Sequence, residues 1–214
     1  ILSVIGNLPI TWEYIIYDEN GGFMSRFSYI KKLEQLAGKV KTANKIELIH
    51  CRSYLSSLIG LKFKLKYKIP FVFDMRGFWA DEKVDGGQWN LKSPLFKRIY
   101  RHYKRKEKEF LLESDAIVSL TDAARRELLS KSEYKSLDIR VIPCCADLEH
   151  FDYRRVTNHD TEKRRNELNI PKDSRVISYL GSVGGWYMTR EMFEFFLTLR
   201  TAHPNFLLLI LSKD

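Results

Sequence analysis

A glycine-rich turn is the first feature of the sequence that could do chemistry. It follows a run of strand-forming residues, precedes a segment of helical periodicity, and contains Gly181, Ser182, Gly184 and Gly185. Glycines let backbone N–H groups approach an anion closely, and the dipole at a helix N-terminus favours negative charge. The turn therefore predicts a binding site for a phosphate or diphosphate, to which Ser182 would add a hydroxyl and Arg190 a positive charge. The alternative is a tight turn in which glycine meets only a steric need.

A second group of reactive side chains follows another apolar run. Asp74 and Arg76 come directly after residues 70–73, and Asp81 and Glu82 follow shortly after. A guanidinium cannot act as a general base, so Arg76 would hold a phosphate or a carboxylate. A carboxylate in a dry pocket has a raised pKa and can orient or deprotonate a hydroxyl group. We assign Asp74 and Arg76 catalytic roles, and the alternative is a structural ion pair between them at a strand end.

Polar residues follow two further expected strands. Arg52 and Ser53 come just past the run that ends in His50, and Thr121 comes just past another run. Because ligands bind at the carboxyl ends of strands in open parallel sheets, we expect these residues to line the same site. His50 itself is expected to be a packed strand residue. The sequence has no Asp-x-Asp motif and no His cluster with ligand spacing, so we expect no metal.

Short apolar runs alternate with longer segments of helical periodicity, and these elements must position the reactive residues. Such alternation is typical of α/β folds, in which crossover helices join parallel strands. Several strands lack an alternating pattern, which indicates a sheet covered on both faces. We expect strands at residues 46–50, 70–73, 116–120, 139–142, 175–180 and 206–211, and helices at residues 24–41, 54–68, 94–112, 122–130, 161–168 and 189–201.

The composition favours a globular chain over a disordered or membrane-spanning one. Of 214 residues, 44% are hydrophobic, which is enough for a sizeable core. No apolar run approaches the roughly 18 residues of a membrane span. The chain has three cysteines, Cys51, Cys144 and Cys145, and the last two are adjacent. An odd number and an adjacent pair predict no disulfide, which fits a reducing cytosol. We expect Cys144 and Cys145 to be buried thiols.

The basic residues outnumber the acidic ones, 36 to 27, which gives a net charge of +9 and an affinity for polyanions, acidic membranes or phosphorylated small molecules. One side of the expected helix at 94–112 is especially basic, with Lys97, Arg98, Arg101, Lys104, Arg105, Lys106 and Lys108. Such a surface suits contact with anionic lipid, and the alternative is a solvated helix face. We expect no nucleic-acid binding, because the aromatic residues lie at core-facing positions and no nucleic-acid module is present.

The segment from Val141 to Phe151, with the sequence VIPCCADLEHF, resembles the VIPNGVDxxxF segment of the group 1 (family 4) retaining glycosyltransferases. In those enzymes the segment ends the N-terminal domain, and after a linker the donor domain begins with a strand and a G-[RS]-x-G turn, as residues 175–185 do here. Similar stretches occur at residues 49–54, 70–82 and 115–121. The resemblance covers residues 46–214.

This resemblance implies a GT-B fold. It implies a partial Rossmann-like N-terminal, acceptor-side domain at residues 1–152, a linker at 153–174, and the first β-α-β unit of a donor domain at 175–214. The implied activity moves a sugar from a nucleotide-sugar to a glycan or lipid-linked acceptor with retention of configuration, as in bacterial members that build surface polysaccharides. No cofactor is implied, because the nucleotide-sugar is a substrate. The donor diphosphate would contact Gly181, Ser182, Gly184 and Gly185, and the acceptor side would contain Arg52, Ser53, Asp81, Glu82 and Thr121.

The sequence also departs from the family pattern. Ser182 stands where the family commonly has Arg, no Lys follows it before Lys213, and Arg76 stands where many members have His. The chain looks cut at both ends, so we expect it to be inactive by itself and to expose an apolar sheet face that a homodimer would cover. The alternative functions are a nucleotide-sugar epimerase of the same fold and a non-catalytic basic binding domain. The expected location is the cytoplasm, with peripheral contact at the inner face of the cell membrane.

Overall fold

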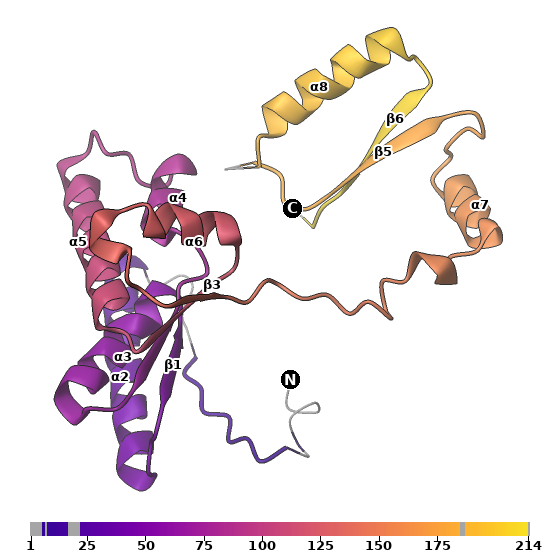
Figure 1. Ribbon diagram of the computed structural model, residues 1–214. Coiled ribbons are helices and arrows are strands. Elements are labelled where there is room, and N and C mark those ends of the chain that lie inside the picture. Colours follow the sequence, from indigo (N-terminus) through magenta and orange to yellow (C-terminus); the bar gives the residue numbers. More distant parts are fainter. Residues whose placement is uncertain (1–5, 7, 17–21, 185–186, 214) are drawn as a thin grey trace. The chain divides into compact units, whose positions relative to one another are not determined.

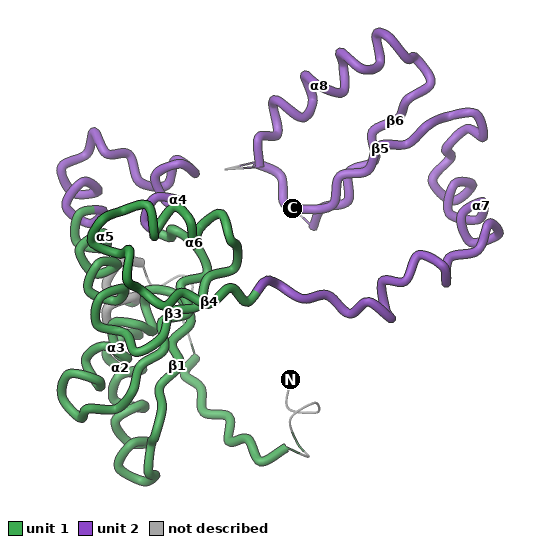
Figure 2. Tube along the Cα trace, viewed as in Figure 1, with its two compact units in different colours: residues 1–79, 101–142 green, residues 80–100, 143–214 purple. Residues whose placement is uncertain are grey.

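The computed structural model describes residues 6, 8–16, 22–184 and 187–213. The chain divides into two compact units, residues 1–79 with 101–142 and residues 80–100 with 143–214 (Figure 2). Each unit contains a parallel sheet, and the expected α/β class is confirmed.

The sheet of the first unit has four parallel strands in chain order, β1 (Ile49–Arg52), β2 (Phe71–Asp74), β3 (Ala116–Ser119) and β4 (Ile139–Val141) (Figure 1). The register places Cys51 beside Phe73, Phe73 beside Ile117, and Ile117 beside Ile139. β1 begins three residues later than expected, because its pairing with β2 starts at Ile49. All four strands therefore end at the same edge of the sheet.

Helices join these strands: α2 (Gly22–Ala43) precedes β1, α3 (Ser53–Tyr67) joins β1 to β2, α4 (Trp79–Asp85) and α5 (Pro94–Glu113) lie between β2 and β3, and α6 (Asp122–Leu129) follows β3 before the 3-10 turn η1 (Ser132–Tyr134). The Thr121 hydroxyl accepts a hydrogen bond from the backbone N–H of Ala124 and so caps α6. Lys68 ends α3 in the left-handed conformation, with its N–H bonded to the Lys64 carbonyl. The sequence pattern did not indicate α4, which is only seven residues long.

One face of this sheet carries the core. Phe71 and Phe73 are fully buried, and Tyr54 of α3 and Phe110 of α5 pack against Phe73 with ring centroids 5.8 and 5.2 Å away. α3 comes so close to the strands that a β-carbon on Gly60 would lie 2.6 Å from a Phe71 ring carbon. The opposite face is less covered.

On that opposite face, Val72 and Val118 are half-buried and Arg140 is exposed. The expectation that both faces of the sheet are covered is therefore wrong for the described residues. Burial alternates along β3 and up to Phe73 in β2, because α3 and α5 both pack on the Phe73 side.

The second unit contains a smaller sheet. After the 3-10 turn η2 (Tyr153–Arg155) and α7 (Asn158–Glu167), β5 (Arg175–Leu180), α8 (Thr189–Ala202) and β6 (Phe206–Leu211) form a β-α-β unit with the two strands paired over their whole length. α7 starts earlier than expected because Thr157 and Asp160 form a reciprocal cap.

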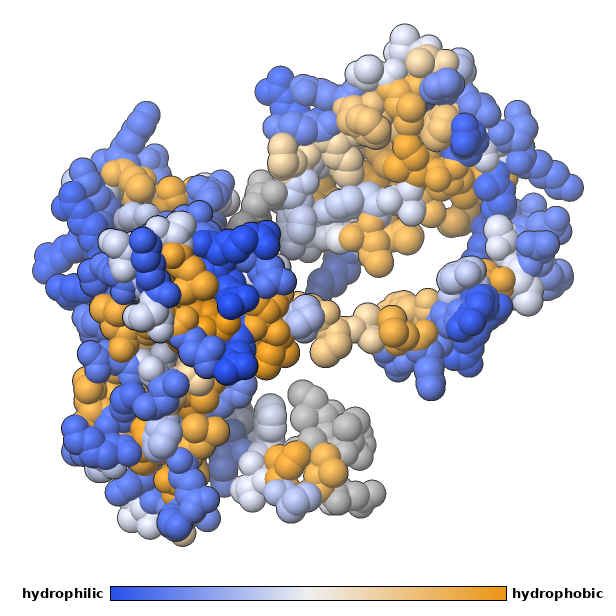
Figure 3. Space-filling view, viewed as in Figure 1, coloured by the Kyte–Doolittle hydropathy of each residue, from blue (hydrophilic) through white to orange (hydrophobic). Residues whose placement is uncertain are grey.

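No residue of β5, α8 or β6 is fully buried in the described structure, although both strands are rich in Leu and Ile. Large apolar side chains of this unit lie at the surface, including Leu180, Phe195 and Leu197. Figure 3 shows apolar surface on the part of the chain that contains β5, α8 and β6.

Candidate functional site

The carboxyl edge of the four-stranded sheet holds two residues with unusual backbone geometry. Arg52 of β1 pairs with Asp74 of β2, so the residues that follow both strands emerge side by side. Ser53 has φ +68° and Arg76 has φ +62°, and the Gly77 N–H donates to the Met75 carbonyl at 2.7 Å across Arg76. Non-glycine residues in this region cost about 1–3 kcal/mol each and collect at functional sites. The strain therefore marks this edge as a candidate site.

Asp74 lies at the same edge and is almost fully buried, with 7% of its surface exposed. Its Oδ2 atom lies 3.3 Å from Nε2 of His50 on the neighbouring strand. Its Oδ1 atom is also buried and has no hydrogen-bond partner among the described residues. A buried carboxylate oxygen without a donor is costly, and such an unsatisfied group in a folded protein is a candidate for a functional role.

His50 corrects the sequence prediction, which took it for a packed strand residue. Its side chain is 57% exposed, because β1 lies at the edge of the sheet that the described residues form and His50 occupies the face opposite to the buried Cys51. The ring can therefore hold the Asp74 carboxylate with one nitrogen while the rest of the imidazole faces outward.

The other expected residues at strand ends have more local roles. Arg52 is exposed, and its carbonyl accepts a hydrogen bond of 2.5 Å from Ser56. The Ser53 carbonyl accepts one of 2.6 Å from Ser57. Thr121 caps α6 through its hydroxyl oxygen, which leaves the hydroxyl hydrogen for a further acceptor.

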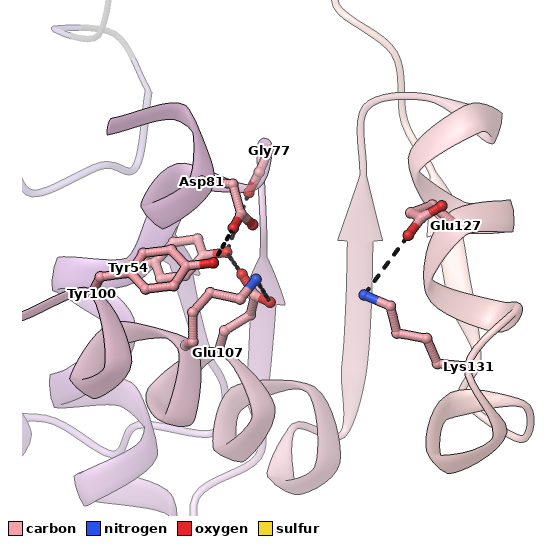
Figure 4. Close-up of polar contacts among 8 residues, drawn as sticks. Tyr54, Gly77, Asp81, Tyr100, Glu107, Glu127 and Lys131 are labelled. Atoms are coloured by element: carbon pink, nitrogen blue, oxygen red, sulfur yellow. Dashed lines mark hydrogen bonds and ion pairs between the residues drawn. The ribbon is translucent and has the colours of Figure 1, made fainter. Parts of the chain in front are cut away.

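Asp81 and Glu82 lie in the first turn of α4. The Tyr100 hydroxyl donates to Asp81 Oδ1 at 2.8 Å (Figure 4), and burial raises the pKa of Glu82 above its ordinary value. Because α4 from Ala80 onward groups with the second unit, the association of Asp81 and Glu82 with the strand ends stays a prediction.

A buried polar cluster behind the strand ends was not predicted. The hydroxyl of the fully buried Tyr54 donates to Glu107, which is 3% exposed, and lies 3.5 Å from the Gly77 carbonyl (Figure 4). Lys104 Nζ lies 2.6 Å from the same carboxylate. Glu107 falls on the apolar stripe of α5, three residues before Phe110, and this misplaced charge is the signal from which sequence reasoning could have found it.

In the second unit, the glycine turn after β5 uses part of its hydrogen-bonding capacity internally. The Gly181 N–H donates to the Leu211 carbonyl at 3.1 Å, and the Gly184 N–H donates to the Thr189 hydroxyl at 2.8 Å. Gly184 has φ +91°, a conformation that favours glycine. Gly185 lies outside the described residues, so its expected contact with a diphosphate stays a prediction.

The cysteines differ from expectation. Cys144 and Cys145 are exposed, whereas we expected them to be buried, because the segment after β4 contains no strand or helix that would cover them. Cys51 is buried, and burial raises the pKa of its thiol to about 11. In the described part of the chain, no three His, Cys, Asp or Glu side chains lie close enough together to bind a metal ion.

Much of the basic charge on α5 is neutralised locally. Lys104, Lys106 and Lys108 each form an ion pair with a glutamate, and Arg105 lies 3.9 Å from Glu109. Lys97, Arg98 and Arg101, nearer the start of the helix, are exposed. None of the helices described is both long and apolar enough to cross a bilayer.

Comparison with known proteins connects this architecture to one family. The model of Glycosyltransferase Family 4 matches residues 12–150, which include the whole four-stranded sheet. A D-inositol 3-phosphate glycosyltransferase of Corynebacterium jeikeium is 25% identical over 135 residues, which cover 63% of this chain and 30% of that protein.

Among solved structures, the sucrose-phosphate synthase of Thermosynechococcus elongatus superposes with a TM-score of 0.56 at 15% identity, over 93% of this chain and 52% of that one. At this identity the likeness concerns the fold alone, and it confirms the expected GT-B architecture. The chain therefore spans about a third to a half of the length of these two proteins.

Proposed function

The chain belongs to Glycosyltransferase Family 4, as the resemblance of residues 141–151 and 175–185 predicted, and from this we propose that the full-length protein is a retaining glycosyltransferase. It moves a sugar from a nucleotide-sugar to a glycan or lipid-linked acceptor. The bond between the anomeric carbon and the leaving diphosphate oxygen breaks, the acceptor oxygen bonds to the same face of that carbon, and the acceptor proton passes to the diphosphate. No metal and no cofactor take part.

The observation that carries this proposal is the carboxyl edge of the family-matched sheet. Asp74, which is almost fully buried and has one oxygen without a partner among the described residues, accepts a hydrogen bond from an acceptor hydroxyl and fixes its direction. Arg76, on a strained backbone next to it, stabilises the negative charge that grows on the leaving diphosphate. Arg52, Ser53 and Thr121 line the acceptor side, for which the resemblance to the family also implies Asp81 and Glu82.

The donor is held by the second unit. Gly181, Ser182, Gly184 and Gly185 contact the diphosphate, in a donor domain that begins at residue 175 after a linker at residues 153–174 and an acceptor-side domain at 1–152. The αL conformation of Gly184 supports this role, because it turns the chain tightly between β5 and α8. The 214-residue chain alone is expected to have no turnover.

We further propose that the enzyme acts at the cytoplasmic face of a membrane. The exposed Lys97, Arg98 and Arg101 of α5 are the basic residues that remain for anionic lipid once the glutamate pairs are discounted. Sedimentation of the protein with vesicles of phosphatidylcholine, with and without phosphatidylglycerol, tests the contact. A triple substitution of these residues by Gln is expected to abolish any dependence on the anionic lipid, and a wild-type protein indifferent to that lipid contradicts the proposal.

The activity is tested on the full-length protein with a panel of radiolabelled nucleotide-sugars. D-inositol 3-phosphate is a useful first acceptor because the curated relative is named for it, and lipid extracts follow. The expected result is label in the acceptor, with an anomeric configuration by NMR that matches the donor. Asp74→Asn and Arg76→Gln are expected to lower kcat at least tenfold, whereas Lys163→Gln, on the surface of α7, leaves it unchanged.

Three outcomes contradict the proposal. Conversion of one nucleotide-sugar into its epimer without an acceptor product identifies an epimerase. Salt-sensitive binding of a polyanion that no nucleotide-sugar affects identifies a basic binding domain. A product of inverted configuration rejects the retaining mechanism.

A further inference from the structure

Two segments that are far apart in sequence meet at the carboxyl edge of β5 and β6. The parallel register ends with Leu180 beside Leu211, and the Gly181 N–H donates to the Leu211 carbonyl at 3.1 Å. The residues that follow each strand therefore emerge together and line a pocket of about 440 Å³, formed by Leu180, Gly181, Ser182, Leu211, Ser212 and Lys213. Ligands of open parallel sheets bind at this edge.

The glycine turn by itself offers an anion less than its sequence suggested. The N–H groups of Gly181 and Gly184 already donate to a carbonyl and to the Thr189 hydroxyl. The Ser182 carbonyl accepts from the Tyr179 hydroxyl at 2.6 Å, which fixes the turn without adding a donor. Because these two N–H groups are occupied, a diphosphate at this edge would gain from donors and positive charge on side chains.

Arg190 and Lys213 are the two basic residues to consider as the source of that charge. Arg190, the cation that the sequence suggested, lies 2.8 Å from Glu194 one turn along α8. Lys213 is the one basic residue that lines the pocket, it is exposed, and no described residue forms an ion pair with it. It follows the end of β6, whereas the family pattern places a Lys shortly after the glycine turn.

We propose that Lys213, with the hydroxyls of Ser182 and Ser212, binds the diphosphate of the nucleotide-sugar. This inference rests on the proposed function and adds the residue that replaces the missing Arg and Lys of the family pattern. The ammonium group carries three donors and a full charge, which suits two adjacent phosphate groups.

The test uses the full-length protein and inorganic pyrophosphate as the probe, with affinity measured by isothermal titration calorimetry. Lys213→Ala is expected to weaken pyrophosphate binding about tenfold, the usual effect of removing one charged hydrogen bond. Lys213→Arg is expected to keep most of the affinity because the charge is retained. Lys163→Ala is the matched control, since Lys163 is an exposed lysine on α7 of the same unit.

Wild-type affinity in Lys213→Ala, an equal loss in Lys163→Ala, or no binding of pyrophosphate to the wild-type protein overturns the inference. Circular dichroism confirms that each variant is folded. Sugar transfer is assayed separately on the same samples. Transfer with an unchanged pyrophosphate affinity in Lys213→Ala rejects this inference alone, whereas Lys213-dependent binding in a protein that transfers no sugar rejects the proposed function alone.

Discussion

Replacement of Tyr54 by Phe removes one oxygen atom from the middle of the first unit. The Tyr54 hydroxyl donates to the carboxylate of Glu107, and both residues are almost completely excluded from water. Phe keeps the ring contacts with Phe73 and Phe110. The change therefore isolates the hydrogen bond from the packing.

The expected cost follows from the charge of the acceptor. A hydrogen bond to a charged group contributes about 1.5–3 kcal/mol, and a buried acceptor that loses its donor cannot turn to water instead. Lys104 still neutralises the carboxylate from 2.6 Å, so the loss stays within that range and does not reach the cost of an unpaired buried charge. We expect the first unit to lose about 2 kcal/mol of unfolding free energy.

Native-state hydrogen exchange measures this loss in the first unit alone, without assuming that both units unfold together. The slowest amides of β2 and β3 should exchange about 30-fold faster in Tyr54→Phe, since 1.4 kcal/mol is a factor of ten. Tyr67→Phe is the control, because Tyr67 is 38% exposed and interacts through its ring with Lys41.

Equal exchange rates in Tyr54→Phe and Tyr67→Phe would refute the reasoning. A double-mutant cycle with Glu107→Gln sharpens the result, because a hydrogen bond between Tyr54 and Glu107 predicts a coupling energy of about 1 kcal/mol or more. If the effects of the two substitutions are additive, the destabilisation by Tyr54→Phe does not come from a hydrogen bond to Glu107.

Three further predictions concern other parts of the chain. Gly60→Ala should destabilise the first unit by about 1–3 kcal/mol in urea unfolding, because the new β-carbon would lie 2.6 Å from the Cys51 sulfur. Gly38→Ala is the control and should be neutral or slightly stabilising, because a β-carbon there has no neighbouring atom within 4 Å. Gly184→Val should weaken nucleotide-sugar binding by the full-length protein at least tenfold in calorimetry, since φ is +91°, and unchanged affinity would reduce the turn to a structural role. At pH 8 a thiol reagent should modify the exposed Cys145 within minutes and spare the buried Cys51. The raised pKa of about 11 keeps the Cys51 thiol protonated at this pH. Equal labelling of both cysteines in the native protein would contradict this prediction.

The sequence predicts the elements of the fold best where a long run of strand-forming residues has a clear start and end. β5 and β6 begin and end at the expected residues, because each is a six-residue run flanked by polar residues. β1 was expected to start at Ile46 and starts at Ile49, since the start of a parallel strand depends on the partner that it pairs with. α4 was missed because seven residues contain too few turns to show a period.

The sequence predicts those residues of the candidate site that directly follow an expected strand. Strand ends placed Asp74, Arg76 and Ser53 together, because a parallel sheet aligns its carboxyl ends. The roles of His50 and Lys213 were not predicted, because each depends on a residue that follows or lies on another strand. His50 Nε2 lies 3.3 Å from the carboxylate of Asp74, and Lys213 lies beside a glycine turn more than thirty residues earlier in the chain. Neither contact produces a pattern in the local sequence.

The order β1-β2-β3-β4 of the first sheet follows the order of the chain. β2, β3 and β4 each leave the ribosome after the strand with which they pair, and none of the described strands has to be inserted between two existing ones. At about 5–20 residues per second, translation of the segment from β3 to β4 takes a few seconds at most, which is long compared with the folding of a small α/β sheet. The order of the described strands is therefore compatible with a first unit that forms strand by strand during its synthesis.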